Sequence, residues 1–358
     1  MDDPLMQPSM TDDGRTVRLG VIGAGRITQV AHLPVFSKTK YVELVAISDP
    51  SAALVHGVAA RYGITGYTDT AEMLNNADVD AVLIAAPDRF HYALGKQAIE
   101  AGKHVLMEKP LAQTSVQAQE LADLAAASGR KLQTGAMKRH DPGIAFAKHH
   151  IERIGEVLSF SSWYRVMADR APVESTLFPA TVVDPEVRRV ENTFKADRES
   201  YLLATHGAHL FDGLTFLGGP GAWVSARVGN VGDDYTWKGV AGMRNSGGLI
   251  SFEVAAAVHG VYAEGADIYG ARGHVKIRTA FPFFKQASEV EVHVDGDPAG
   301  LVPHFGDTDA YKLQADDFGR AILEDLPEDP SPQDGVAAVR WIEAVAESST
   351  HAGREVAL

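Results

Sequence analysis

Short apolar runs alternate with amphipathic stretches along the N-terminal part of the chain. The runs fall at 17–22, 42–48, 80–86, 105–107 and 131–135, and each is too short for a helix. Near-continuous apolar runs of this length are typical of parallel strands that are buried on both faces. Helical patterns occupy the intervals, for example 51–62 and 115–127. The alternation predicts an α/β domain with a doubly wound parallel sheet and right-handed connections.

Beyond residue 138 the pattern changes to longer strands in which apolar and polar residues alternate. Such strands are predicted at 157–167, 224–231, 237–244, 249–258 and 266–269. Helices are predicted at 143–153, 201–217, 307–326 and 333–348. Alternation indicates a sheet with one face against helices and the other face exposed. The second half is therefore predicted to be an α+β domain with a large open, mainly antiparallel sheet.

Length and composition allow two such domains, each with its own core. The chain has 358 residues, of which 45% are hydrophobic and 22% are charged, as in ordinary globular proteins. The first residues carry aspartates and prolines but lack the basic and apolar regions of a secretory signal. We expect a flexible tail over residues 1–16, the α/β domain over 17–137 and the α+β domain over 138–358.

The charge balance and the absence of cysteine remove several classes of function. The formal net charge is −14, so a sequence-independent grip on nucleic acid or an anionic membrane is not expected. No apolar run is long enough to span a bilayer. A chain without cysteine has no disulfides, thiolate metal sites or cysteine nucleophiles. No His, Asp and Glu set has metal-ligand spacing. A cytoplasmic enzyme or binding protein without a metal fits these bounds.

The first apolar run ends in a glycine turn. Gly23 and Gly25 are followed by Arg26 and Ile27, where a helical pattern begins. The first glycine permits a tight turn, and the second lets the backbone approach a pyrophosphate held at the helix N-terminus. Thr28 occupies the position of the third small residue. Taken alone, the motif is equally compatible with a plain glycine turn.

An aspartate ends the second predicted strand. Asp49 lies where an acidic residue accepts hydrogen bonds from the adenosine ribose and repels a 2′-phosphate. This position favours NAD over NADP. The alternative is an aspartate that only caps the following helix.

A lysine stands at the end of the strand predicted around 105–107. The run continues into Glu108, Lys109 and Pro110, and the proline stops the strand. Ligands of open α/β sheets bind beyond the carboxyl ends of the strands, so Lys109 can reach a bound cofactor and its substrate. The simpler alternative is a solvated lysine at a strand end.

Together, these blocks resemble the glucose-fructose oxidoreductase / inositol dehydrogenase / rhizopine catabolism (Gfo/Idh/MocA) family of NAD(P)-dependent oxidoreductases. The resemblance is carried by Gly23-Ala24-Gly25, by Ala86-Pro87-Asp88 with His91, and by the run from Ala101 to Pro110. It implies an N-terminal Rossmann domain that binds NAD and a C-terminal domain for substrate binding and oligomerisation. The implied cofactor-binding residues are Gly23, Gly25, Arg26, Ile27, Asp49, Ala86, Pro87, His91, Glu108 and Lys109. Asp88 departs from the family, in which asparagine is common.

The helix predicted at 201–217 carries the second part of the implied site. Related enzymes have Asp-x-Gly-x-His here; Gly207 and His209 match, and Thr205 replaces the aspartate. The resemblance implies that Lys109 and His209 are catalytic. Threonine can offer at most a hydrogen bond, whereas a carboxylate would raise the pKa of the histidine. The expected substrate-binding residues are Lys109, Arg165, Thr205, His206 and His209.

Residues 169–200 show little periodicity. They carry Arg170, Arg188, Arg189, Lys195 and Arg198. A loop this long inside a domain is usually functional or disordered. It is interpreted as a substrate lid, a subunit contact or a solvated loop, and the basic residues leave open an anionic sugar as ligand.

The resemblance implies a dehydrogenase that oxidises a secondary hydroxyl of a sugar, glycoside or cyclic polyol. Two alternatives stay open. Some relatives are glycosidases that oxidise a hydroxyl transiently, eliminate the aglycone, add water and return the hydride. A non-catalytic dinucleotide and sugar sensor is the third possibility, because Thr205 replaces an acid. Sheets of this family pack face to face, so a homodimer or homotetramer is expected.

Overall fold

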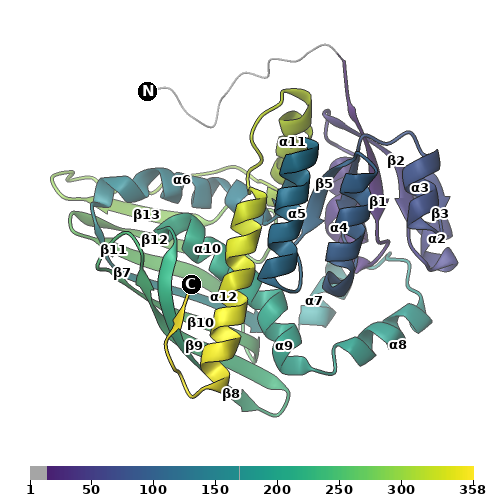
Figure 1. The fold of residues 1–358 in the computed structure, drawn as a ribbon. Helices are drawn as coiled ribbons and strands as arrows, with labels where there is room; N and C mark the ends of the chain where they lie inside the picture. Colours follow the sequence, from purple (N-terminus) through teal and green to yellow (C-terminus); the bar gives the residue numbers. More distant parts are fainter. Residues whose placement is uncertain (1–13, 169) are drawn as a thin grey trace.

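Strand β1 (Val17–Ile22) lies at the centre of a parallel six-stranded sheet with the order β3-β2-β1-β4-β5-β6. The computed structural model, which describes residues 14–168 and 170–358, is drawn in Figure 1. The other strands are β2 (Val42–Ser48), β3 (Thr65–Tyr67), β4 (Ala81–Ile84), β5 (His104–Glu108) and β6 (Leu132–Gly135). The strand order reverses beside β1, which pairs with β2 on one side and β4 on the other. The predicted doubly wound parallel sheet is confirmed.

Helices connect these strands in the predicted alternation. They are a π-helical turn (Thr28–His32) with α1 (Leu33–Phe36), then α2 (Ala52–Tyr62), α3 (Thr70–Asn76), α4 (His91–Glu100) and α5 (Ser115–Ser128). Strand β3 and helix α3 were not predicted. Strand β3 is a three-residue edge strand that is mostly exposed, so it leaves no apolar run in the sequence.

A second, eight-stranded sheet has the order β13-β12-β11-β7-β10-β9-β8-β14. Its strands are β7 (Val157–Met167), β8 (Gly221–Val231), β9 (Asp234–Met243), β10 (Leu249–Val258), β11 (Ala263–Gly270), β12 (Gly273–Thr279), β13 (Glu289–Val294) and β14 (Val356–Ala357). Strand β7 pairs in parallel with β10, and the other pairs are antiparallel. The predicted open, mainly antiparallel sheet is confirmed.

Helices cover one face of the second sheet (Figure 1). They include α6 (Pro142–Ile151) and α10 (Ala208–Gly218), and α12 (Pro332–Thr350) lies beside them. Phe160, Trp237 and Phe252 of the sheet are buried in one cluster with Phe211 and Trp341 of the helices. The apolar halves of the alternating strands therefore form this core.

The two C-terminal helices also reach the first sheet. Phe318 of α11 (Ala310–Leu323) is buried in the cluster around β1, and Val336 and Val339 of α12 are buried beside β4 and β5. The division of the chain at residue 137 stays a prediction, because helices beyond that residue complete the packing of the first sheet.

The segment predicted as a loop at 169–200 contains helices, and this prediction is corrected. Its described part forms α7 (Arg170–Leu177), α8 (Pro185–Phe194) and α9 (Arg198–Leu202). Helix α8 buries none of its residues, and its apolar stripe consists only of Val187, Val190 and Phe194, so the helix was missed. Its start signal was nevertheless present, because Asp184 caps the helix and Pro185 occupies its first position.

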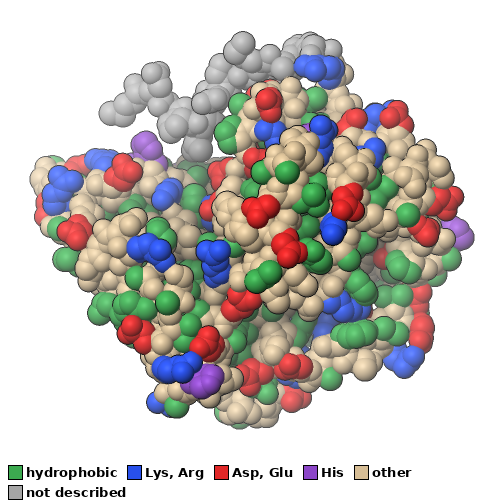
Figure 2. Space-filling model, viewed as in Figure 1, with side chains coloured by type: hydrophobic (Ala, Val, Ile, Leu, Met, Phe, Trp, Pro, Cys, Tyr) green, Lys and Arg blue, Asp and Glu red, His purple; other side chains and the backbone are tan. Residues whose placement is uncertain are grey.

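Helix α9 continues through a π-helical turn (Leu203–Gly207) into α10, so the helix predicted at 201–217 is confirmed and begins slightly earlier. Acidic and basic side chains are interspersed on the face shown in Figure 2. Within 14–168 and 170–358, none of the helices has the length and apolarity to cross a membrane.

Candidate active site

A cavity of about 1090 Å³ lies at the carboxyl ends of β1, β4 and β5. One side is formed by the glycine turn, the ends of β4 and β5, and Lys109; the other side is formed by Tyr164, Thr205, His206, His209 and Tyr262. Typical ligand pockets measure roughly 300–1,000 Å³. The cavity is therefore large enough for a dinucleotide together with a small substrate.

The glycine turn has the geometry that a dinucleotide requires. Gly23 has a φ of +99°, and a Cβ atom there would lie 2.8 Å from the carbonyl oxygen of Ala85. Only glycine can occupy this position. At Gly25 no atom lies within 4 Å of where a Cβ would stand, and this residue lines the cavity with Arg26 and Ile27. The open space beside the backbone fits a pyrophosphate at the start of the following helix.

Asp49 holds the glycine turn against the end of β2. Its Oδ2 accepts a hydrogen bond from the backbone nitrogen of Ala24 at 2.9 Å, and its Oδ1 accepts one from Ser51 at 2.9 Å. Ser51, not Asp49, caps α2. Each carboxylate oxygen retains capacity for a further bond, so the aspartate fits a ribose hydroxyl while it orders the turn.

Ala86, Pro87 and His91 line the cavity beside the glycine turn. The His91 ring lies between two carbonyl oxygens, with Nδ1 2.7 Å from Pro110 and Nε2 2.9 Å from Ala86. This ring ties the end of β4 to the end of β5. His91 is thus placed to shape the cofactor side of the cavity.

Glu108 pairs with a histidine that the sequence analysis missed. Glu108 Oε1 lies 2.7 Å from Nε2 of His32, and its Oε2 accepts a hydrogen bond from the backbone nitrogen of Lys109 at 3.1 Å. Burial raises the pKa of Glu108, but the hydrogen bond and charge of His32 and the charge of Lys109 outweigh burial and lower it. Glu108 is therefore ionised beneath Lys109. No motif marked His32.

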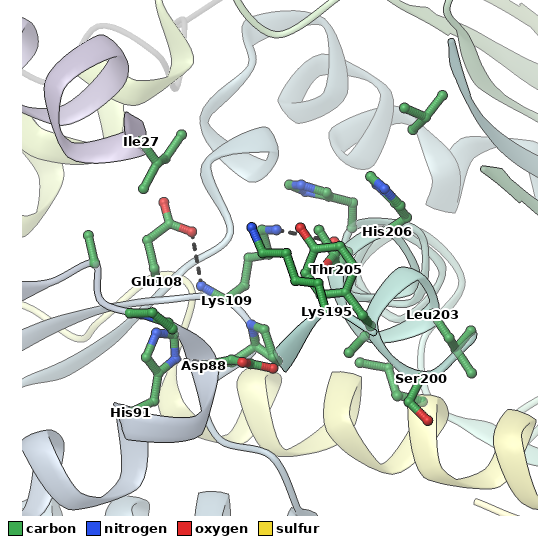
Figure 3. A pocket seen from close by; sticks show the side chains of 18 of the residues that line it. Ile27, Asp88, His91, Glu108, Lys109, Lys195, Ser200, Leu203, Thr205 and His206 are labelled. Atoms are coloured by element: carbon green, nitrogen blue, oxygen red, sulfur yellow. Dashed lines mark hydrogen bonds between the residues drawn. The ribbon is translucent and has the colours of Figure 1, made fainter. Parts of the chain in front are cut away.

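Lys109 extends from the end of β5 toward Thr205, with the carboxylate of Glu108 beside its backbone nitrogen (Figure 3). Its Nζ donates a hydrogen bond to the carbonyl oxygen of Thr205 at 3.1 Å, and its peptide bond to Pro110 is cis. Burial lowers the pKa of Lys109 to about 8 against the opposing charge of Glu108. The ammonium group is thus held by a neutral backbone carbonyl.

His206 and His209 both stack on the ring of Tyr164. Their rings stack on Tyr164 with centroid distances of 5.7 and 5.5 Å. Burial, reinforced by nearby cations that include Lys109, lowers the pKa of both histidines well below the usual value. Both are therefore neutral at pH 7 and able to accept a proton. Within the described residues, Nδ1 of His206 is buried without a hydrogen-bond partner.

A buried polar network next to the histidines was also missed. Lys138 forms an ion pair with Glu264, which accepts a hydrogen bond from the hydroxyl of Tyr262. The Lys138 Nζ lies 4.3 Å from the centre of the Tyr164 ring. The network therefore holds the Tyr164 ring, on which His206 and His209 stack. In the sequence, Lys138 marks only the start of the predicted second domain.

Arg165 does not belong to this site, and its predicted role in substrate binding is corrected. Its Nε forms an ion pair with Glu253 at 2.7 Å. Alternation along β7 buries Tyr164 and Val166 in the core and turns Arg165 to the opposite face.

The basic residues of 170–200 do not all face the cavity. Arg170, Lys195 and Arg198 line the cavity, whereas Arg189 is paired with Glu186 in an exposed ion pair. Arg170 itself is paired with Glu174. Across 14–168 and 170–358, no His, Cys, Asp and Glu group is arranged to hold a metal ion.

Comparison with known proteins relates the N-terminal part of the chain to a family of oxidoreductases. Residues 17–136 match the family model GFO_IDH_MocA, described as an oxidoreductase family with an NAD-binding Rossmann fold. The chain is 36% identical over 140 residues to inositol 2-dehydrogenase 1 of Saccharopolyspora erythraea, which covers 38% of this chain and 42% of that protein. It is 35% identical over 128 residues to D-glucoside 3-dehydrogenase of Escherichia coli, covering 36% of each. These matches span less than half of either relative.

Similarity of fold extends over nearly the whole chain. Levoglucosan dehydrogenase in complex with NADH has a TM-score of 0.80 at 21% identity, covering 96% of this chain and 99% of that one. A putative myo-inositol dehydrogenase from Sinorhizobium meliloti has a TM-score of 0.74 at 25% identity, with coverage of 96% and 99%. The overall fold of this chain is therefore a known one.

Proposed function

Because residues 17–136 match the model of an oxidoreductase family with an NAD-binding Rossmann fold, we propose that the chain is an NAD-dependent dehydrogenase. Its proposed substrate is the secondary hydroxyl of a sugar, glycoside or cyclic polyol. The observation that carries the proposal is that Lys109 and His209 line one cavity together with the glycine turn. The dehydrogenases of inositol and glucosides among the relatives support this substrate class.

In this proposal, bound NAD supplies a hydride acceptor, and the chain handles the proton. His209 is neutral because burial lowers its pKa, so its ring accepts the proton of the substrate hydroxyl. The Lys109 ammonium, held by the Thr205 carbonyl at 3.1 Å, stabilises the negative charge that develops on the substrate oxygen. His206 and Thr205 hold the sugar from the same helix. Tyr164 stacks on the His209 ring and so orients the proposed base.

The first test follows NADH absorbance and aglycone release together while the protein is incubated with NAD and a panel of free sugars, inositols and aryl glycosides. We expect NADH to form with at least one sugar or polyol and no aglycone to be released. Aglycone release that depends on NAD without NADH accumulation would identify a redox-cycling glycosidase. NAD binding without either signal would favour a sensor.

We also propose that the exposed face of the second sheet joins copies of this chain in a homodimer or homotetramer. Val240, Leu249 and Tyr269 are 42–51% exposed on this sheet, although each is hydrophobic. Light scattering of the purified protein should give a multiple of the 38.4 kDa chain mass, and a monomeric mass would contradict the proposal. The cytoplasmic location stays a prediction.

A further inference from the structure

Helices α7 to α9 and their connections, residues 170–202, form a strap across the cofactor side of the cavity. Its middle is fastened to the helix that follows the glycine turn. The Val182 backbone nitrogen donates to Oε1 of Gln29 at 2.7 Å, and Nε2 of Gln29 donates to the Val182 carbonyl oxygen at 3.0 Å. Val182 also packs against α2, because a Cβ atom at Gly57 would lie 2.9 Å from its side chain. The strap thus lies where the loops after β1 and β2 meet.

The C-terminal end of α8 is bound to Arg89 in the segment that follows β4. Arg89 forms two hydrogen bonds with Glu191, at 2.5 and 3.2 Å. The guanidinium of Arg89 also lies 3.8 Å from the centre of the Phe194 ring. In Figure 1, α8 runs beneath the first sheet, away from the second sheet. The strap therefore spans the edge at which a dinucleotide binds in a doubly wound sheet.

One carboxylate of the strap reaches the end of β2. Asp184 uses Oδ1 to cap α8 by accepting a hydrogen bond from Glu186 at 2.9 Å, and its Oδ2 accepts one from the Ser51 hydroxyl at 2.6 Å. The Ser51 backbone nitrogen donates to Asp49 at 2.9 Å. Asp184 and Asp49 thus each accept a hydrogen bond from Ser51. The hydrogen bond from Ser51 lowers the pKa of Asp184, so this carboxylate is charged at neutral pH.

We propose that Asp184 acts with Asp49 as a second specificity-determining carboxylate at the adenosine ribose, where it excludes the 2′-phosphate of NADP. The inference rests on the proposed NAD-dependent function. A ribose hydroxyl can donate a hydrogen bond to a carboxylate, whereas a phosphate brings up to about two negative charges beside it. Two carboxylates from segments far apart in the sequence oppose those charges. The preference for NAD over NADP is therefore larger than Asp49 alone would produce.

The test is nucleotide binding by the full chain and by the Asp184→Asn variant. Asparagine keeps an oxygen for the helix cap and an amide that can bond Ser51, so it removes the charge and little else. We expect the Kd for NADP to fall about tenfold relative to the Kd for NAD, which is the effect of one nearby charge in a partly exposed site. Isothermal titration with each nucleotide measures both constants without any turnover.

Glu186→Gln is the matched control. It removes the same charge from the first turn of the same helix, but Glu186 is exposed and paired with Arg189. Its Kd ratio should equal that of the unmodified chain. An unchanged ratio in Asp184→Asn while NAD still binds, or an equal change in the control, would overturn this inference and leave the dehydrogenase proposal standing. Failure of the unmodified chain to bind NAD would overturn both.

Discussion

Replacing Lys109 with alanine is expected to lower kcat by roughly 10²- to 10³-fold, the loss that follows removal of one donor to a developing oxyanion. The Lys109 Nζ is the cation that lies beside Thr205 in the catalytic cavity. NAD binding should change little, because the glycine turn and Asp49 are built from other segments. Steady-state kinetics with the best substrate of the panel, together with titration of NAD, measures both effects.

Lys103→Ala is the control for this substitution. Lys103 precedes the same strand, but its Nζ donates to the carbonyl oxygen of Val79 at 2.8 Å, and Lys103 is not among the residues lining the cavity. Its kcat should stay close to that of the unmodified chain. Equal turnover in the Lys109→Ala variant would show that the lysine has no catalytic role.

The same lysine sets the expected pH dependence. Burial lowers the pKa of Lys109 to about 8, so the cation that stabilises the oxyanion is present below this value and is lost as the pH rises through it. The pKa of His209 is well below its usual value, so the histidine remains a neutral base across the same range. The kcat should therefore fall above about pH 8, and Lys109→Arg should move this fall to higher pH. A kcat that rises through pH 8 would mean that neutral lysine is the active form.

The second large effect is expected on stability. Replacing Asp212 with alanine should lower the free energy of unfolding by about 3–5 kcal/mol, because it leaves a buried guanidinium without its main partner. The side chains of Asp212 and Arg139 are each 6% exposed, and Arg139 donates three hydrogen bonds of 2.7–3.1 Å to the carboxylate. The pair joins the chain leaving the first sheet to α10, which carries His209. Urea unfolding at neutral pH measures the loss.

Asp78→Ala provides the comparison for this prediction. Asp78 pairs with Arg18 at 3.3 Å on the surface beside the first sheet, and the two side chains are 83% and 40% exposed. Its removal should cost less than about 1 kcal/mol, as for other surface ion pairs. Similar losses in the two variants would show that burial of the Arg139 pair contributes nothing of its own.

The strap and Arg165 are two cases in which the structure differs from the sequence-based prediction. Helix α8 buries no side chain fully, but its apolar residues Val187, Val190 and Phe194 have helical spacing and Asp184 caps it, so local patterns were sufficient to predict this helix. Arg165 was predicted to bind substrate, yet the alternation along β7 places it on the opposite face of the strand from Tyr164. A stricter use of period two would have excluded it. The contact between Asp184 and Ser51 had no local signal, because it joins residues from different halves of the chain.

The sequence by itself determined the first sheet, the glycine turn, and the positions of Lys109 and His209 on a strand end and a helix. These features depend on local apolar runs, turn residues and short motifs that neighbouring residues set. Only the tertiary structure decided that Glu108 is paired with His32 and that Lys109 is held by the Thr205 carbonyl. It also decided that Tyr164, Tyr262 and the Lys138–Glu264 pair lie beneath the histidines. Burial and charge at the site arise where distant segments pack together, and no local pattern encodes that packing.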